Sequence, residues 1–548
     1  MTSGYAIATL VVFILSIVFV ICPVSIPAVR PIPRIPINLT TAPILAIALL
    51  WAAQCIDPAV IRDGIVGTEG VKPYNILILF FSLAYMAITL DITGILQSAA
   101  FWVSNKGGSS GWRLYFYFYV MLTLLSVLLG NDPVILSGTA FLVYYTKAAE
   151  LNPVAWLMSE FAAANTASMV LFVGNPTNVV ICEGFSVNNA AFTAYTILPF
   201  LACNILCFLA LAGQYHKEKY VPRKLDVTAH LDARSVLLDP VGAWVGSIML
   251  GSALILCLVV SFFGIDVWKI SLPFAVGKFV YDLAWDHYRY TRNIPMLGHG
   301  LPAKTVDGAE AEEGVMVDAL EHQLKHRQAT LPTTSSEKTS SFPSDEQTAV
   351  DPDTQPSSPK VAAQTVFSRQ RSTLEATHAR LYSHFPTFFT ALPRLPFALV
   401  PFAFSQFILI EALAHQGWTD VFATWLIRAS QKQIYPTIWL IGVLGVILCN
   451  LSGTNIGATI LLTKVVRAAA LPYQADRAAA IALAVASNIG AVSFTFSASL
   501  AGLLWRDILK QKGIIVKQGT FAYWNTIPLV VMTVAGLAIV SAEMAVLF

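Results

Sequence analysis

The sequence predicts an all-α membrane protein that crosses the bilayer many times. It contains 56% hydrophobic and only 12% charged residues, with a mean hydropathy of +0.65, which lies outside the usual range of soluble domains. Uncharged stretches long enough to span a bilayer recur along the chain. Polar, helix-breaking clusters lie inside them in both halves. We therefore expect two inverted repeats of transmembrane helices, each with a re-entrant helical hairpin and a broken helix.

The first part of the chain predicts four spans. Residues 2–29 carry no charge, and neither a basic region nor an obvious cleavage site precedes Pro23, which indicates a retained helix rather than a cleaved signal peptide. A segment from Asp91 through Trp102 is mixed in character, and we expect it to lie at the membrane interface as an amphipathic helix. Three uncharged runs of 18 residues each have the length of a span: 39–56, 73–90 and 114–131.

Two interruptions divide the next part of the chain. Residues 134–148 are apolar but too few to cross the bilayer and return, so we expect one arm of a re-entrant hairpin that closes near Asn152. The run 161–182 is long enough to span, but Gly174-Asn175-Pro176 interrupts it. Because proline removes a helical hydrogen bond, this predicts two half-helices. Further spans are expected within 184–215, near 240–263 and at 267–284.

Residues 286–394 differ in composition from the sequence around them. They hold 24 of the chain's 66 Asp, Glu, Lys and Arg residues. Their centre, 328–360, is rich in Ser, Thr and Pro, a composition that cannot bury enough apolar surface to fold. We predict a disordered hydrophilic loop between a first repeat at 1–285 and a second at 395–548. As its role, a spacer is favoured over a phosphorylation-controlled tail.

The second half repeats the plan of the first. An apolar run at 395–410 ends in Glu411, and a mixed segment continues through Arg428. An uncharged run at 434–463 is broken at Ser452-Gly453-Thr454-Asn455, and the spans that follow are expected within 478–505 and 518–542. We expect about ten to thirteen membrane segments, two of them re-entrant. The distribution of Lys and Arg leaves the orientation open.

The polar clusters of the two halves align at a constant spacing. Shifting the numbering by 323 places Gly130-Asn131-Asp132 on Gly453-Thr454-Asn455, and Asn165 on Asn488. A shift of 320 places Asp91 on Glu411. Polar groups are costly in hydrocarbon unless they are buried in protein or line a cavity, and paired breaks in corresponding halves are typical of the midplane site of a secondary transporter. The clusters therefore predict a transport site.

The predicted substrate or ion site consists mostly of neutral amides and hydroxyls, which suit the partial desolvation of an ion or a small oxygen-rich solute. A single Asn is more often an interhelical hydrogen-bonding residue, and the symmetric clustering is what favours a site. The predicted binding residues are Asn131, Asp132, Asn165, Thr166, Asn175, Thr177, Asn178, Thr454, Asn455 and Asn488.

Asp132 is the most informative single residue. A carboxyl group in an otherwise uncharged run must be paired, face water or be protonated, so Asp132 is the first candidate for proton coupling. Its alternative role is a structural cap at the start of the following half-helix. Asp91 and Glu411 are further coupling candidates, but interfacial caps or ion-pair partners are equally good interpretations, because both lie at the ends of apolar runs.

At these residues the chain resembles the ion-transporter superfamily, whose members carry a citrate transporter-like domain, and it is most similar to the arsenical-pump permeases. Ala164-Asn165-Thr166-Ala167-Ser168 and Gly174-Asn175-Pro176-Thr177-Asn178 carry the resemblance, which covers most of both halves outside 286–394. Asn165 stands where those permeases typically have Asp, and Thr454-Asn455-Ile456-Gly457 replaces their Asn-Asn-Leu-Pro. The Ser-Asn-Thr signatures of sodium-coupled dicarboxylate carriers are missing at both tips, which favours protons over sodium.

The residues and the resemblance together imply a secondary carrier of small anions or oxyacids, with arsenite or antimonite efflux and proton coupling as the leading interpretation. A citrate or dicarboxylate carrier, a sodium/proton antiporter and an ion channel stay open as alternatives. We find no nucleophile-base motif, HExxH or phosphate loop, so no enzymatic activity, catalytic residue, metal site or cofactor is expected.

The expected partners are the lipid bilayer, a small-molecule or ion substrate and a coupling ion, and a homodimer is compatible with the sequence. The net charge of +2 gives no indication of nucleic-acid binding. The expected location is the plasma membrane or the vacuolar membrane, as a multi-pass integral protein. Cys203 and Cys207, four residues apart, could offer thiols to trivalent arsenic, but a buried Cys is usually only a small hydrophobic residue.

Overall fold

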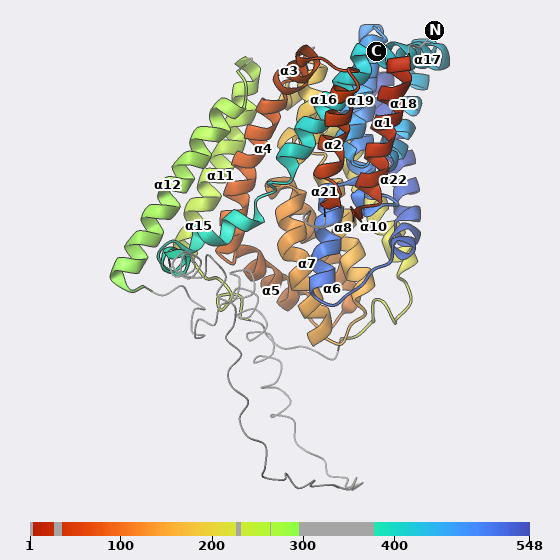
Figure 1. Ribbon diagram of the computed structural model, residues 1–548. Coiled ribbons are helices and arrows are strands. Elements are labelled where there is room, and N and C mark those ends of the chain that lie inside the picture. The colour runs from red at the N-terminus through yellow and green to blue at the C-terminus, as the bar shows by residue number, and fades with distance from the viewer. Residues whose placement is uncertain (1–3, 27–34, 69, 226–231, 264, 295–376) are drawn as a thin grey trace, which may run out of the picture.

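The protein is a bundle of helices (Figure 1). The computed structural model describes residues 4–26, 35–68, 70–225, 232–263, 265–294 and 377–548. The only strands in these ranges are β1 (Val24–Ile26) and β2 (Ile35–Ile37), which pair antiparallel with Val24 opposite Ile37. The elements that flank the polar clusters are therefore all helices.

The helices of the first half of the chain are α1 (Gly4–Ile21), α2 (Thr41–Ala52), α3 (Pro58–Val66), α4 (Pro73–Ile92), α5 (Ile95–Gly107), α6 (Gly111–Leu129), α7 (Asn131–Ala148), α8 (Pro153–Ala167), η1 (Phe172–Gly174), α9 (Pro176–Gly184), α10 (Asn189–Gln214), α11 (Pro240–Val260), η2 (Ser261–Phe263) and α12 (Trp268–Arg292).

The helices of the second half are α15 (Pro386–Ala391), η3 (Leu392–Arg394), α16 (Leu399–His415), α17 (Trp418–Ser430), α18 (Ile434–Leu451), α19 (Asn455–Ala468), α20 (Tyr473–Ile489), η4 (Phe496–Ala498), α21 (Leu500–Gln511) and α22 (Gln518–Leu547).

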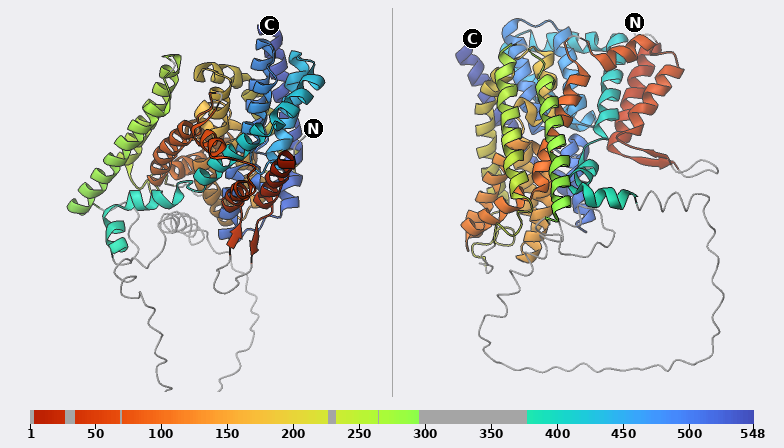
Figure 2. Two further views of the ribbon diagram at one scale, coloured as in Figure 1. Left: turned by 45° about the horizontal axis from the view of Figure 1, so that its top comes forward. Right: turned by 90° about the vertical axis from the view of Figure 1, so that its left-hand side faces the viewer.

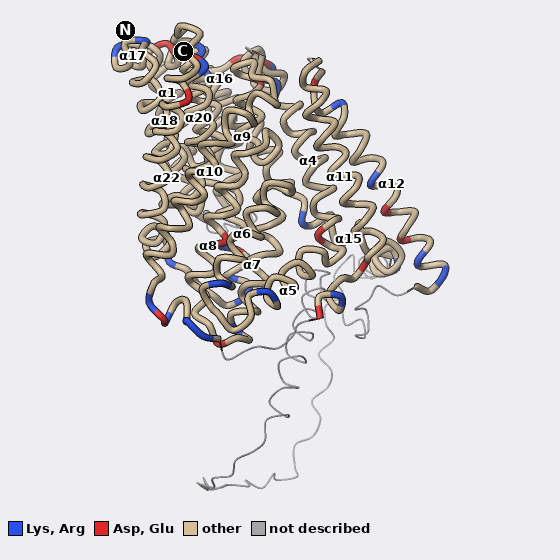
Figure 3. Tube along the Cα trace, turned by 180° about the vertical axis from the view of Figure 1, so that it is seen from behind, with Lys and Arg blue, Asp and Glu red and all other residues tan. Residues whose placement is uncertain are grey.

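Eight helical segments of the described chain are long and apolar enough to cross a membrane. They are α1, α4, α6, α10, α11 with η2, α15 to α16, α18 and α22. Charged residues gather at the two ends of the bundle, and most of the length between the ends is uncharged (Figure 3). This pattern is what a bilayer demands, and it confirms a multi-pass membrane protein.

Two large hydrophobic cores each combine residues from both halves of the chain. One joins Phe101 and Phe161 of the first half to Val485 and Phe521 of the second. In the other, residues of α4 and α9 pack with residues of α16 and α19. The views of Figure 2 show the C-terminal helices among those of the first half. The halves thus form one packed body, which brings distant polar clusters within reach of each other.

A glycine at the same place in each half marks the register between them. Gly94 precedes α5 with a φ of 82°, and Gly417 precedes α17 with a φ of 78°, a left-handed conformation that favours glycine. Their spacing is 323 residues. This register places Asp91 opposite Ala414, so the expected pairing of Asp91 with Glu411 at 320 is not supported. Helices α5 and α17 lie at opposite ends of the bundle (Figure 1), while the inverted-repeat relation itself stays a prediction.

Three predicted segments differ in the structure. The expected span at 39–56 contains only α2, whose 12 residues are too short to cross, because the helix ends before Asp57 begins α3 as its N-cap. Helix α12 occupies the expected span at 267–284 but is not among the eight apolar segments, since it carries charged residues along its length. The described ends of the predicted loop 286–394 are helical, and its residues 295–376 lie outside the described residues.

Candidate functional site

Each half contains a helix that stops and restarts at a glycine. Helix α6 ends at Leu129, and α7 begins at Asn131 after Gly130, whose φ is 84°. In the second half, α18 ends at Leu451 and α19 begins at Asn455, with Gly453 at a φ of 83°. Both breaks lie where the sequence predicts them. They free the backbone groups of two helix starts, α7 and α19, for other interactions.

A second break follows in each half. Between α8 and α9 it covers residues 168–175, and Asn175 caps α9 by accepting a hydrogen bond from the Thr177 N–H at 3.2 Å. Between α20 and α21 it covers 490–499, and Ser499 caps α21 from the corresponding position, accepting from the Gly502 N–H at 3.0 Å. The sequence predicts a single span within 478–505, and this break corrects that prediction.

The amides of the first half bond to one another. Asn131 on α7 donates to Oδ1 of Asn165 on α8 at 3.2 Å, and Asn165 donates to the Phe161 carbonyl at 2.8 Å. Asn131 is 5% exposed, and Asn165 is fully buried. The Ser168 hydroxyl lies 2.7 Å from the Asn165 carbonyl, which carries the network toward the second break. These residues join the two arms of the α7–α8 hairpin.

Asn488 of α20 connects the halves. Its Nδ2 donates to Oδ1 of Asn178 at 2.7 Å, and its Oδ1 lies 2.8 Å from the Ser168 hydroxyl and 3.3 Å from Nδ2 of Asn175. Asn178 in turn donates to the carbonyls of Ser168 and Leu171, at 2.8 and 2.9 Å. The second half therefore supplies the residue around which the polar groups of the α8–α9 break assemble.

The remaining predicted residues separate into two groups. Asn455 donates to the Ser487 carbonyl at 3.3 Å, and the Ser487 hydroxyl lies 3.3 Å from that of Thr177. Asn455 and Thr177 therefore belong to the same polar network as Asn488. Thr166 instead contacts Met532 Sδ on α22 at 3.2 Å, and the Thr454 hydroxyl caps α19 by accepting from Gly457 N–H at 3.2 Å. Their side chains thus serve packing and capping.

The amide network is neutral. Within the described chain, its hydrogen bonds go only to amides, hydroxyls and backbone groups. Asp132 lies beside it in the first turn of α7, where the helix dipole favours a negative charge. Its side chain is half-buried, and no hydrogen bond or ion pair to another described residue involves it. Asp132 does not cap α7, because the cap position is Gly130.

The other two predicted coupling residues lie in ion pairs. Asp91 is 1% exposed, accepts a hydrogen bond from the Ser137 hydroxyl and pairs with Nη1 of Arg394 at 3.5 Å. Glu411 pairs with Nζ of Lys464 at 2.7 Å. Both acids are therefore ion-pair partners in the structure, which is one of the alternatives to a coupling role given above.

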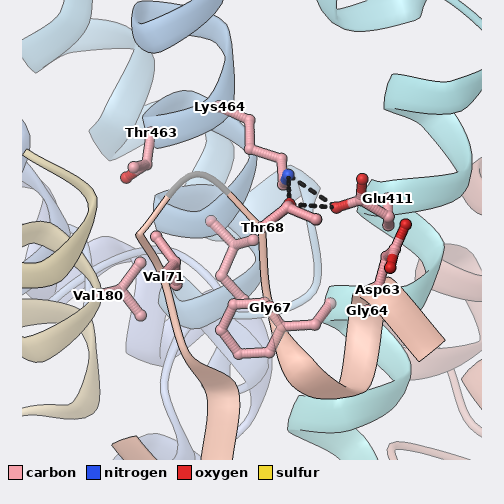
Figure 4. A pocket seen from close by; sticks show the side chains of 11 residues that line it. Asp63, Gly64, Gly67, Thr68, Val71, Val180, Glu411, Thr463 and Lys464 are labelled. Atoms are coloured by element: carbon pink, nitrogen blue, oxygen red, sulfur yellow. Dashed lines mark hydrogen bonds and ion pairs between the residues drawn. The ribbon is translucent and has the colours of Figure 1, made fainter. Parts of the chain in front are cut away.

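Figure 4 shows the surroundings of Glu411. The Thr68 hydroxyl, on the loop before α4, donates to Glu411 Oε2 at 2.9 Å, and Lys464 Nζ lies 2.7 Å from the same hydroxyl. These three residues line a small cavity together with Asp63 and Thr463. The cluster ties α16, α19 and the loop before α4 to one another.

A buried acid outside the predicted site residues lies on α8. Glu160 is fully buried, and the Thr139 hydroxyl of α7 lies 3.0 and 3.1 Å from its two carboxyl oxygens. In the described chain no cation pairs with it. It directly precedes the uncharged run 161–182, and its closeness to Asn165 is the signal in the sequence that points to it.

Charges also line the buried face of α12. Lys278 pairs with Asp282, which also accepts from the Tyr85 hydroxyl at 3.0 Å. Asp286 accepts from the backbone N–H and the hydroxyl of Thr387, both at 2.9 Å. Every acid of this face has a polar partner on a neighbouring element, so the stripe attaches α12 to α4 and α15.

Two family models match the chain. The model described as citrate transporter matches residues 11–289, and the one described as arsenical pump membrane protein matches residues 388–541. The first match ends near the start of the charged segment 286–394, and the second begins near its end.

Curated relatives agree with the second match. The chain is 26% identical over 238 residues to the arsenical pump membrane protein of Yersinia enterocolitica and 24% identical over 241 residues to that of Escherichia coli K12, in both cases over 42% of this chain and 54% of the relative. It is also 24% identical over 155 residues to a 46 kDa membrane protein of Mycobacterium leprae, covering 28% and 35% of the two chains. The chain thus spans about half the length of its first curated relatives.

Among solved structures, the crystal structure of the Alcanivorax borkumensis YdaH transporter aligns with 99% of this chain and 97% of its own, at 12% identity and a TM-score of 0.41.

Proposed function

Because this chain belongs to the citrate transporter family of membrane transporters, we propose that it is a secondary carrier of small anions or oxyacids, with arsenite and antimonite as the first substrates to test. The observation that carries the proposal is Asn488, which joins the polar groups of both broken halves into one buried network. Neutral amides at helix breaks suit a solute that must shed its water inside the protein.

We further propose that protons drive transport through Asp132. Asp132 directly follows Asn131 of the amide network in the sequence. Within the described chain it lacks a cation partner, whereas Asp91 and Glu411 each have one. An acid held by a fixed cation gains little from binding a proton, whereas an acid without one can load and release it. Coupling to sodium is the less favoured alternative.

A citrate or dicarboxylate substrate is the second candidate, because the model that matches the first half carries that description. Uptake and growth in cells lacking their own pumps would separate the candidates, with arsenite, antimonite, citrate, succinate, sulfate and sodium as challenges. We expect the protein to raise tolerance to arsenite and antimonite. Unchanged tolerance combined with accumulation of a carboxylate would replace the efflux proposal and leave the carrier proposal standing.

An ion channel would also use broken helices and polar lining residues, so the transport class needs its own measurement. Flux through a carrier saturates with substrate and responds to an imposed pH gradient. Planar-bilayer recordings of the purified protein are therefore expected to show no unitary current steps. Discrete single-channel steps carried by the same solute would contradict the carrier proposal.

A further inference from the structure

Gln406 on α16 is a buried amide without a partner. Its side chain is fully buried, and neither Oε1 nor Nε2 hydrogen-bonds to any described residue. Burying an amide that way costs free energy, because its hydrogen bonds to water are lost and not replaced. Nothing in the sequence marks this residue as functional, since Gln carries no charge and does not interrupt the apolar run 395–410.

The amide points at the start of α19. A Cβ added to Gly457, in the first turn of that 14-residue helix, would lie 3.2 Å from Gln406 Oε1 and 3.3 Å from the Ser452 carbonyl. The hydroxyls of Ser452 and Thr454 close by already bond to other groups: Ser452 to the carbonyls of Leu448 and Thr454, and Thr454 to Gly457 N–H. Gln406 is thus an uncommitted polar side chain at the positive end of a helix dipole.

The position also adjoins the amide network. Asn455 begins α19 two residues before Gly457, and its side chain donates to Ser487 O, next to Asn488. The register set by Gly94 and Gly417 places the buried, apolar Leu83 opposite Gln406. At this position the described residues of the two halves therefore differ chemically, with an amide in the second half and a hydrocarbon side chain in the first.

We propose that Gln406 binds the transported solute at the start of α19, and that it selects oxyacids that retain a hydroxyl group. The NH₂ group would donate to a solute oxygen while Oε1 accepts from a solute hydroxyl, and the helix start favours a partial negative charge on the same solute. Arsenite and antimonite have this chemistry, whereas sulfate presents acceptors only. This inference rests on the proposed function and names a specificity residue for it.

Thermal unfolding of the purified protein in detergent, with arsenite as the titrated probe, tests the inference. Gln406→Met keeps the length of the side chain and removes the amide. Because it also removes an unsatisfied buried group, the midpoint without arsenite is expected to stay the same or rise. The arsenite affinity deduced from the ligand-induced shift is expected to fall about tenfold. Gly457→Ala, which crowds Oε1, should weaken arsenite binding in the same direction.

Gln214→Met, at the end of α10 where the amide donates to the Trp524 carbonyl, is the control and should leave the arsenite affinity unchanged. If Gln406→Met leaves the arsenite affinity at the wild-type value, whatever its effect on the midpoint without arsenite, the amide does not bind the solute and the inference is overturned. If the midpoint of the wild-type protein responds to none of arsenite, antimonite, citrate and succinate, both the proposed function and this inference are contradicted.

Discussion

The acids inside the bundle, some buried and some half-buried, differ in what holds them. Asp91 and Glu411 have cations, Glu160 has a threonine hydroxyl, and Asp132 has no partner among the described residues. The sequence could place Asp91, Asp132 and Glu411 near the ends of apolar runs, because charge stands out there. It could not tell which acid meets a cation, since Arg394 lies 303 residues from Asp91 in the chain.

The ion pair of Glu411 and Lys464 makes a prediction at the scale of single residues. Their side chains are 15% and 9% exposed. Lys464→Met leaves the carboxylate without its cation, and we expect the free energy of unfolding to fall toward the lower end of the about 3–5 kcal/mol typical of a broken buried pair. Chemical unfolding in detergent would measure this loss.

The double variant Lys464→Met with Glu411→Gln is the control for that experiment. It removes both charges, so it should recover a large part of the lost stability. If the double variant is less stable than Lys464→Met by the full cost of Glu411→Gln alone, the two side chains act independently and the ion pair contributes nothing.

Glu160 makes a second prediction at this scale. Glu160→Gln keeps the hydrogen bond with Thr139 and removes the charge, so we expect expression, folding and pH-driven transport to persist. Glu160→Leu leaves the Thr139 hydroxyl unpaired and should lower the unfolding midpoint. Loss of pH-driven accumulation in Glu160→Gln with normal folding would move the coupling role from Asp132 to Glu160.

At the scale of elements, the breaks marked by Gly, Asn and Pro could be predicted and the others could not. Gly174-Asn175-Pro176 contains residues that end or cap helices, and the structure starts α9 at Pro176. The corresponding break at 490–499 has no Asn or Pro, and after Gly490 it consists of Ala, Val, Phe, Thr and Ser, which also occur inside helices. Its helix start depends on Ser499 as a cap, and a single Ser in an apolar stretch gives little signal.

Gly130 and Gly453 provide a matched pair for testing the breaks. Both have φ near +84°, where an alanine is strained by about 1–2 kcal/mol. A Cβ at Gly130 would meet its nearest neighbour, the Gly174 carbonyl oxygen, at 3.6 Å, whereas one at Gly453 would lie 2.9 Å from Val20 Cγ1 on α1. We expect Gly453→Ala to lower the thermal midpoint more than Gly130→Ala. Equal midpoints would show that α1 gives way without cost.

At the scale of the whole molecule, the two halves meet in one amide network. The sequence could align Asn165 with Asn488, because the spacing between the polar clusters repeats. It could not show that Asn488 bonds to Asn175 and Asn178 of the other half rather than to residues of its own. Which helices pack together depends on the complementary shapes of many apolar side chains, and a single sequence does not reveal those shapes.

A double-mutant cycle between Asn178 and Asn488 tests this junction. The two amides are in contact, so their alanine variants should be non-additive, with a coupling of about 0.5–3 kcal/mol in the unfolding free energy. A cycle between Asn131 and Asn488, which share no hydrogen bond, should give a smaller value. Additive effects of Asn178→Ala and Asn488→Ala would contradict a network that joins the halves.

Uptake into proteoliposomes, with and without a pH gradient, tests the central claim of proton-coupled transport through Asp132 most directly. Asp132→Asn preserves the size of the side chain and removes its titration. We expect the variant to fold, to bind substrate and to exchange it at equal pH, but to lose accumulation driven by the pH gradient, while the wild type accumulates. An Asp132→Asn protein that still accumulates substrate against its gradient in a pH-dependent way would contradict the claim.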